Sequence, residues 1–348
     1  MATKVGVLTR REIESQPLVW TEILSEVRSR VETLRAFQQS TPVDAVLFTG
    51  CGSTYYLSLA AAAIFQALTG LPSRGLPASE IWGNQESAYS SRLRHLLVAV
   101  SRSGETSETI AAVKAFKQRG HGDVMTLTCH ADSELAQLGA VNMVLSAAQE
   151  QSIVQTRAFT ALQLGATMLA AIWAHRDDLL EQLGHLPAVA ERMMSHCAER
   201  IVRLGRDARF DRVYFLGSGA RYGLACEASL KMKEMSLSHS EPFHFLEFRH
   251  GPMSMANDAT LLVGLVSEAN SMRERAVMDS MLAQGTTPFT MGERDADVAF
   301  ESGVDAAIRD VLYLPPLQLL AFERALSRGL DPDSPRNLSA VVRLPKSP

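Results

Sequence analysis

Two short stretches of the chain have nearly the same pattern. Phe48–Ser53 reads FTGCGS, and Phe215–Ala220, 167 positions later, reads FLGSGA. Each stretch follows a short apolar run and precedes a pattern typical of a long helix, at 55–68 and at 222–237. A strand, a glycine-containing turn and a helix form the unit from which parallel α/β sheets are built. The repeat therefore predicts two copies of one α/β architecture.

Around the repeat, short aliphatic runs alternate with helical patterns, which is typical of a parallel sheet covered by helices on both faces. We expect helices at 11–40, 104–119, 158–174 and 176–200, and strands at 44–49, 95–100, 123–128, 141–145, 212–216, 260–266, 287–291 and 311–314. The predicted organisation is an N-terminal helical segment (1–35), a first domain (36–175), a second domain (195–335) and a C-terminal tail (336–348).

The composition excludes several classes of protein. The 348 residues are 46% hydrophobic and 21% charged, which is ordinary for a globular protein. A net charge of −4 argues against a nucleic-acid partner. The four scattered cysteines form no CxxC pair, and no apolar run reaches the roughly 20 residues of a membrane span. With no apolar leader at the N-terminus, we expect a cytoplasmic protein without a membrane segment.

The first candidate for chemistry is Ser101–Thr106, which reads SRSGET. It follows an apolar strand and opens a predicted helix, so three hydroxyls and free backbone N–H groups lie at a helix N-terminus. Such a loop can bind phosphate. The same hydroxyls can also cap the helix without any ligand. The matching stretch of the second copy, 266–269, reads VSEA, so a carboxylate replaces the hydroxyl cluster there.

The second candidate is the turn Gly50–Thr54, which reads GCGST. Glycines let a backbone turn tightly beside a ligand, and parallel sheets bind ligands at the carboxyl ends of their strands. A structural strand-to-helix turn has the same pattern. The motif is not a dinucleotide fingerprint, because Tyr55 stands where GxGxxG requires glycine.

The third candidate is the stretch 226–252. Glu227, Lys231 and Glu234 share one helix face, and the commoner interpretation of such spacing is a solvated ion-pair stripe. His250 precedes Gly-Pro in a turn. A carboxylate and a histidine acting on a sugar can move protons between adjacent carbons. A metal site formed by the three histidines of this stretch is disfavoured, since their spacing matches no ligand pattern.

Taken in order, these motifs resemble the SIS (sugar isomerase) family. The likeness is greatest to the isomerase half of glucosamine-6-phosphate synthase and to related sugar-phosphate isomerases, deaminases and deglycases. It covers nearly the whole chain, in the segments 12–17 (EIESQP), 50–53 (GCGS), 101–106 (SRSGET), 156–160 (TRAFT), 230–234 (LKMKE), 250–252 (HGP), 316–321 (PLQLLA) and 334–338 (SPRNL). The resemblance implies two tandem SIS domains, each a parallel five-stranded sheet in a three-layer α-β-α sandwich, in a homodimer with shared active sites.

The resemblance also implies a role for individual residues. Glu234 matches the carboxylate that moves a proton between C1 and C2, and His250 matches a histidine that assists ring opening, supplied in the synthase by the neighbouring subunit. No metal or organic cofactor is implied. Three residues match the phosphate ligands of a sugar 6-phosphate site: Ser101, Ser103 and Thr106. Arg102 stands in this loop in place of the common Gln. The residues that match the sugar-lining positions are Gly52, Ser53 and Thr54.

Three departures from the synthase pattern limit the predicted activity. Ala2 follows Met1 where the glutaminase domain has its nucleophilic cysteine, so we expect no glutamine-dependent amide transfer. Ala340 stands where the synthase tail has the lysine that forms an imine with the ketose, and an alanine side chain can neither form an imine nor donate a proton. Gln155 stands where the synthase has a small hydroxyl residue near the sugar.

The sequence therefore predicts a phosphosugar isomerase or an amino-sugar-6-phosphate deaminase-type enzyme. It would act on a hexose 6-phosphate, or on its amino sugar, by proton transfer between C1 and C2. Two alternatives stay open: a deglycase of an N-substituted sugar 6-phosphate, and a non-catalytic sugar-phosphate sensor, which the loss of the tail lysine favours.

Overall fold

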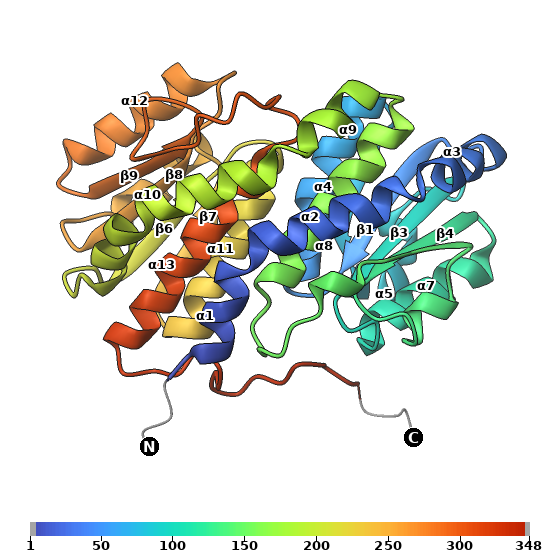
Figure 1. The fold of residues 1–348 in the computed structure, drawn as a ribbon, viewed down its shortest axis with the longest axis horizontal. Coiled ribbons are helices and arrows are strands. Elements are labelled where there is room, and N and C mark those ends of the chain that lie inside the picture. Colours follow the sequence, from blue (N-terminus) through green and yellow to red (C-terminus); the bar gives the residue numbers. More distant parts are fainter. Residues whose placement is uncertain (1–4, 345–348) are drawn as a thin grey trace. The chain divides into compact units, whose positions relative to one another are not determined.

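The computed structural model describes residues 5–344, which divide into two compact units. The N-terminal sheet unit comprises residues 18–150, 157–184 and 339–344. The C-terminal sheet unit comprises residues 5–17, 151–156 and 185–338. Each unit contains one parallel five-stranded sheet flanked by helices (Figure 1). No helix within residues 5–344 is both long enough and apolar enough to cross a bilayer.

In the N-terminal sheet unit the strand order is β2-β1-β3-β4-β5. The chain leaves β1 toward one edge of the sheet and returns to β3 on the other side, so the loops after β1 and β3 diverge at the carboxyl edge. Parallel sheets bind ligands at such a switch point. The strands are β1 (Ala45–Gly50), β2 (Ser73–Pro77), β3 (His95–Ser101), β4 (Gly122–Thr128) and β5 (Val141–Val144).

Helices cover both faces of this sheet. α4 packs beside α8, and α5 packs beside α7. The second pair encloses a core that includes Leu47 of β1, Leu97 of β3 and Phe116 of α7. The helices of the unit are α2 (Gln16–Arg28), α3 (Val31–Ser40), α4 (Ser53–Thr69), α5 (Ala78–Gly83), α6 (Gln85–Ala88), α7 (Ser107–Arg119), α8 (Arg157–Trp173) and α9 (Asp177–Leu183).

The C-terminal sheet unit repeats the same topology, with the strand order β10-β9-β8-β6-β7. α11 and α10 both pack against α13, and α12 packs over an apolar cluster that includes Phe245 and Phe248. The strands are β6 (Arg212–Leu216), β7 (His239–Phe243), β8 (Thr260–Leu265), β9 (Thr287–Gly292) and β10 (Val298–Ala299). The helices are α1 (Val7–Glu14), α10 (Leu186–Arg206), α11 (Ala220–Ser236), α12 (Ser271–Leu282) and α13 (Leu314–Ser327).

The strands that the sequence analysis missed lie at or beside the sheet edges. β2 and β7 are edge strands, and both contain proline, which an edge strand tolerates because its free side needs no ladder hydrogen bond. Gly75 of β2 is required by close packing, because a Cβ there would lie 2.5 Å from the carbonyl oxygen of Ser58 in α4. The short β10 is also an edge strand.

The predicted strand at 311–314 is wrong. Residues Asp310–Tyr313 form a 3-10 helix, and α13 begins at Leu314. An apolar run of this length is compatible with a strand or a buried helix. The two prolines that follow decide the outcome, because Pro315 and Pro316 can occupy the first turn of a helix but cannot donate to a central sheet. The single helix expected at 176–200 is instead α9 and α10, which are separated near Gly184.

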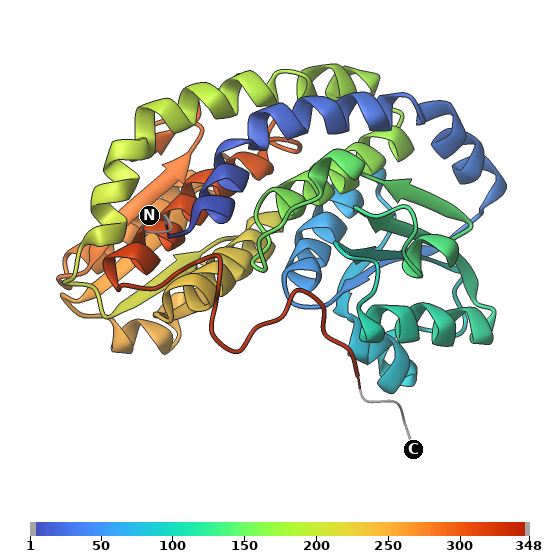
Figure 2. The same cartoon turned by 60° about the horizontal axis from the view of Figure 1, so that its bottom comes forward.

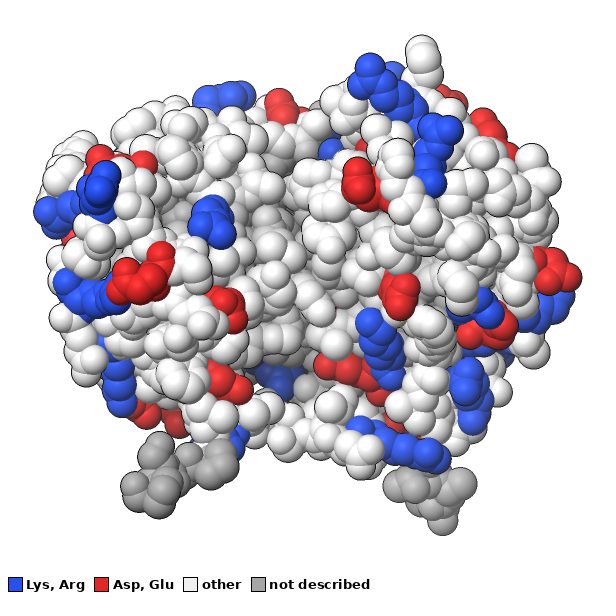
Figure 3. All heavy atoms as spheres, turned by 180° about the vertical axis from the view of Figure 1, so that it is seen from behind, with Lys and Arg blue, Asp and Glu red and all other residues white. Residues whose placement is uncertain are grey.

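Basic and acidic side chains are mixed on the face of the molecule drawn in Figure 3, as a small net charge allows. A mixed surface of this kind provides no broad field of one sign to attract a polyanion.

The N-terminus of α1 is capped by residues from the far end of the chain. Asp333 accepts hydrogen bonds from the backbone N–H of Leu8 at 2.9 Å and of Thr9 at 2.8 Å, and also from the Thr9 hydroxyl at 2.7 Å. Asp331 accepts from the N–H of Gly6 at 3.0 Å. These carboxylates satisfy donors that a helix start leaves unpaired, and they interact favourably with the helix dipole.

We predict that Asp333→Ala lowers the free energy of unfolding by about 1–2 kcal/mol, the range for loss of a helix cap. Urea denaturation followed by far-UV circular dichroism measures the change. Asp333→Asn keeps an acceptor oxygen and is expected to lose less. Equal losses for the two variants, or no loss for either, would contradict a capping role for Asp333.

Candidate active site

The loop after β3 brings the predicted phosphate ligands together at the carboxyl edge of the N-terminal sheet. The Ser101 hydroxyl accepts from the N–H of Gly104 at 3.1 Å and lies 3.3 Å from the Thr106 hydroxyl. The Ser103 hydroxyl accepts from the N–H of Glu105 at 3.1 Å. Thr106 is the N-cap residue of α7, but its side chain makes no capping bond. The loop therefore brings three hydroxyls together at the N-terminus of a helix, where an anion is favoured.

Gly104 is essential to the shape of this loop. Its φ is +68°, and a Cβ on this residue would lie 2.0 Å from the Ser133 hydroxyl oxygen. Only glycine fits a left-handed position this close to a neighbour.

The turn after β1 lies beside this loop. Thr54 closes the turn, because its hydroxyl accepts from the N–H of Cys51 at 2.9 Å and donates to the Cys51 carbonyl at 3.0 Å. Gly52 has a φ of +56° with open space around it. The Cys51 thiol lies 3.5 Å from the Thr109 hydroxyl of α7, which ties the two loops together, and burial raises the pKa of this thiol. Ser53 and Thr54 are buried in the first turn of α4.

Arg102 contacts protein groups on two sides. One guanidinium nitrogen bonds a Glu150 carboxylate oxygen at 3.0 Å, and another donates to the Ala340 carbonyl at 3.1 Å. The side chain of Arg102 is 8% exposed and that of Glu150 is fully buried. Its predicted part in phosphate binding stays a prediction, and Glu150 is a neighbour that the sequence did not indicate.

In the C-terminal sheet unit, α11 holds a buried cluster of charges. Lys231 is 1% exposed and bonds the carboxylate of Glu234, and its Nζ also lies 3.3 Å from a carboxylate oxygen of the fully buried Glu227. The interpretation of a solvated stripe is therefore wrong. α11 packs against β6, β7 and α13, which buries Glu227 and Lys231 and leaves Glu234 partly exposed.

Exposure distinguishes Glu234 from the other two charged residues of this cluster. Burial alone would lower the pKa of Lys231, but the carboxylates of Glu227 and Glu234 outweigh it and raise that pKa, so the lysine is an ammonium. The Glu227 side chain is fully buried, whereas that of Glu234 is 19% exposed. Glu234 is therefore the carboxylate of the cluster that reaches the surface.

His250 and Gln155 come from other segments of the same unit. His250 is exposed after the short helical turn Glu247–Arg249 and precedes Gly251, whose φ is +120°. Gln155 is half-buried, and its Oε1 is buried with no hydrogen-bond partner. A buried oxygen in this state requires a donor from elsewhere.

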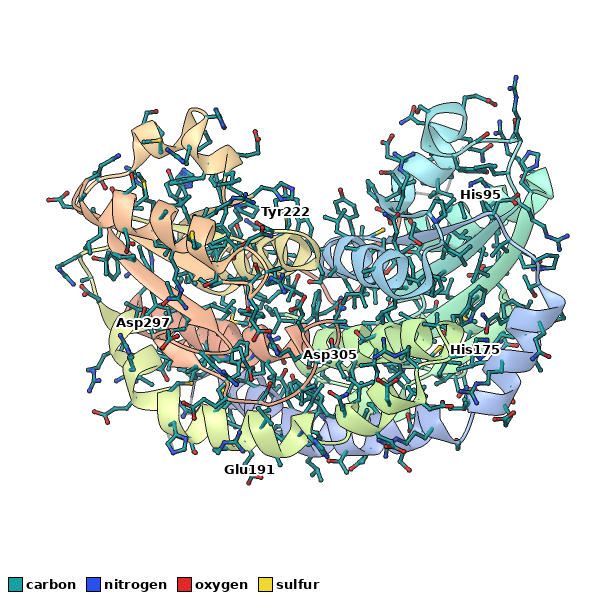
Figure 4. All side chains as sticks on the ribbon, turned by 90° about the horizontal axis from the view of Figure 1, so that it is seen from above. His95, His175, Glu191, Tyr222, Asp297 and Asp305 are labelled. Atoms are coloured by element: carbon teal, nitrogen blue, oxygen red, sulfur yellow. The ribbon has the colours of Figure 1, made fainter. Side chains whose placement is uncertain are left out.

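An aromatic pair lies at the start of α11. Tyr222, labelled in Figure 4, stacks on His244 with 3.8 Å between ring centroids, and His244 follows the carboxyl end of β7. Burial lowers the pKa of His244. The stack fixes the loop that leads to Phe248 and His250, and the spacing of 22 residues between its members gave no indication of it.

Comparison with known proteins adds to this geometry. Residues 41–174 match the SIS domain family. The glutamine–fructose-6-phosphate aminotransferases (isomerizing) of Xanthomonas campestris and Haemophilus influenzae are each 30% identical, over 319 and 320 residues, which is 86% of this chain and 52% of each relative. The chain thus spans about half the length of these relatives.

Solved structures of similar fold include two sugar-phosphate enzymes. A glucosamine-6-phosphate deaminase from Thermotoga maritima is 27% identical with a TM-score of 0.81, covering 97% of this chain and 99% of that one. The tagatose-6-phosphate ketose/aldose isomerase of Escherichia coli is 19% identical with a TM-score of 0.84, covering 94% and 95%, and supports the fold alone. Residues 41–174 of this chain therefore match the SIS domain, and the similarity to the sugar-phosphate enzymes named above extends over most of its length.

Proposed function

We propose that this protein is an enzyme that moves a proton between C1 and C2 of a hexose 6-phosphate or its amino sugar. The observation that supports this most strongly is the partly exposed Glu234 carboxylate, which the buried Lys231 ammonium holds on α11. A protein that only binds a sugar phosphate has no need of a buried cation that positions a carboxylate at the surface. The reaction is an isomerisation, or for an amino sugar a deamination.

The phosphate is bound by the loop after β3. The hydroxyls of Ser101, Ser103 and Thr106 offer several neutral donors to one anion. The dipole of the 13-residue helix α7 adds a favourable potential. Gly52, Ser53 and Thr54 line the sugar beside this loop.

Glu234 acts as the base and then as the acid. It takes the proton from C2 of the open-chain aldose and returns it to C1, so the carboxylate is regenerated in each turnover. Lys231 remains protonated and stabilises the charge on Glu234 before and after the transfer. The open-chain substrate requires ring opening, in which His250 serves as the proton donor and acceptor.

For an amino sugar, the nitrogen of the substrate replaces the missing lysine. After proton transfer the C2 amine becomes an imine, and water then releases ammonia and leaves the ketose 6-phosphate. This route uses no side chain at position 340, where the chain has Ala340. The similarity to the 27% identical deaminase supports this branch over simple isomerisation.

We also infer that the C-terminal sheet unit is a second SIS domain and that the protein works as a homodimer. The C-terminal sheet has the strand order of the first, which supports two tandem domains near 36–175 and 195–335. The exposed position of His250 is compatible with a histidine that serves the site of a partner subunit.

A non-catalytic sensor is the second candidate, because Ala340 lacks the side chain that imine chemistry with a ketose uses. Turnover of any sugar phosphate would exclude it.

The first prediction from this proposal concerns Glu234. NMR of the protein with glucosamine 6-phosphate in D2O is expected to show exchange of the C2 proton together with ammonia release. Glu234→Gln is expected to lower both rates by at least about 100-fold, because it removes a general base. Glu199→Gln, an exposed change on α10, is the matched control. Unchanged turnover in Glu234→Gln would refute the assignment of the base.

The second prediction concerns the loop Ser101–Thr106, here called the phosphate loop. Ser103→Ala and Thr106→Ala are each expected to weaken binding of fructose 6-phosphate by roughly tenfold or more, because each removes a donor to a charged group. Isothermal titration calorimetry measures this, with Ser40→Ala at the end of α3 as the control. Wild-type affinity in both variants would show that these hydroxyls only stabilise the loop.

The third prediction concerns shared sites. Co-expressed Glu234→Gln and His250→Ala chains are expected to recover roughly a quarter of wild-type turnover, because half of the dimers are mixed and each mixed dimer has one intact site. Each variant alone is the control. No recovery, with mixed dimers detected by native mass spectrometry, would place both residues in a site formed by one subunit.

A further inference from the structure

The segment Ser339–Leu344 lies against the start of α7 within the N-terminal sheet unit. The Val342 carbonyl accepts from the N–H of Ser107 at 3.4 Å, and the N–H of Leu344 donates to the Ser107 hydroxyl at 3.2 Å. The segment forms neither helix nor strand, as the red end of the chain in Figure 2 shows. These two bonds use only the main chain of the segment, and the exposed Arg343 side chain adds an ion pair with Glu105 at 4.0 Å.

Arg102 provides the strongest of these contacts. Its guanidinium donates to the Ala340 carbonyl at 3.1 Å, and a charged donor makes a stronger hydrogen bond than a backbone amide does. The direction of the guanidinium is fixed by the buried Glu150, which bonds it at 3.0 Å. Glu150 also accepts from the N–H of Ala158 at 3.3 Å, at the start of α8. The loop Ser101–Thr106, the segment Ser339–Leu344 and α8 are thereby linked through the ion pair of Arg102 with Glu150.

We propose that Arg102 is a positioning residue that fastens the C-terminal segment Ser339–Leu344 across the phosphate loop. Its side chain acts on the bound anion through the docked segment, because its nitrogens are engaged by Glu150 and Ala340. A docked segment shields the loop from water and so strengthens the interactions of its donors with an anion. The effect on the anion rests on the function proposed above, whereas the docking itself does not.

The backbone of Arg102 supports the same role. Its carbonyl accepts from the N–H of Cys129 at 3.2 Å and from the Thr128 hydroxyl at 3.3 Å, so the residue is anchored to the end of β4 as well as to the tail. A glutamine at this position could form hydrogen bonds but, being neutral, could not balance the charge of a buried carboxylate.

Hydrogen exchange of the protein without ligand tests the docking. The double variant Arg102→Gln/Glu150→Gln avoids leaving an unpaired buried charge. We expect the amides of Ser107 and Leu344 to exchange about tenfold faster than in wild type, as loss of a charged hydrogen bond predicts. Arg119→Gln, at the other end of α7, is the control and should leave both amides unchanged. Wild-type protection of both amides in the folded double variant would overturn the proposal.

Binding of inorganic phosphate separates docking from function. A chain ending at Leu338 lacks the docked segment and is expected to bind phosphate several-fold more weakly than wild type. Adding Arg102→Gln/Glu150→Gln to this shortened chain should then cause no further loss, because Arg102 acts through the segment. A further loss of similar size would make Arg102 a direct ligand. Failure of wild type to bind phosphate would contradict the proposed function while leaving the exchange result valid.

Discussion

The position of both candidate loops, after β1 and after β3, follows from one constraint, the pairing of β1 with β3 in a parallel sheet in which both strands are buried. Parallel neighbours need crossover connections, and β1 and β3 send theirs toward opposite edges. No helix can then cover the point between their carboxyl ends, where the chain must turn out of the sheet. Gly52 and Gly104, both with positive φ, make these turns. The group of hydroxyls after β3 is therefore a consequence of strand order as much as of its own sequence.

In the second copy a carboxylate of the protein lies at the corresponding point of the same topology. After β8, the N–H of Ser267 is bonded at 2.6 Å by the carboxylate of Glu274, which comes from the first turns of α12. A carboxylate of the protein thus takes the position of an external anion at a helix start. In both copies a serine hydroxyl at the strand end also accepts from the N–H three residues on, Ser101 from Gly104 and Ser267 from Asn270. The two copies therefore share this turn, and the second adds a carboxylate of the protein to it.

The sequence predicts the parts of this fold that local patterns determine. Central strands such as β1, β3 and β8 are continuous apolar runs and were located to within about a residue or two. The edge strands β2 and β7 are not predicted because they are half-exposed and contain proline, and Val311–Leu314 is wrongly predicted as a strand because a short apolar run does not distinguish a strand from a buried helix. The candidate loop Ser101–Thr106 is contiguous in the sequence and its use as a phosphate site stays a prediction. The contact of Arg102 with Glu150 joins residues 48 positions apart, which only the folded chain reveals.

Lys231 illustrates why spacing alone is a poor guide to burial. The i, i+4 and i, i+3 spacing of Glu227, Lys231 and Glu234 is the same in a solvated stripe and in a buried cluster. The difference lies in the rest of α11, whose Leu224, Cys226, Met232 and Met235 are buried around the helix. A buried ammonium is costly unless the chain neutralises it, and removing one partner of such a cluster costs about 3–5 kcal/mol. The buried Glu227 and the partly exposed Glu234 both contact Lys231, so the ammonium is neutralised inside the protein while one of its two carboxylate partners stays within reach of solvent. Burial of the lysine accounts for Glu227, and the exposure of Glu234 is the feature on which the proposed proton transfer depends.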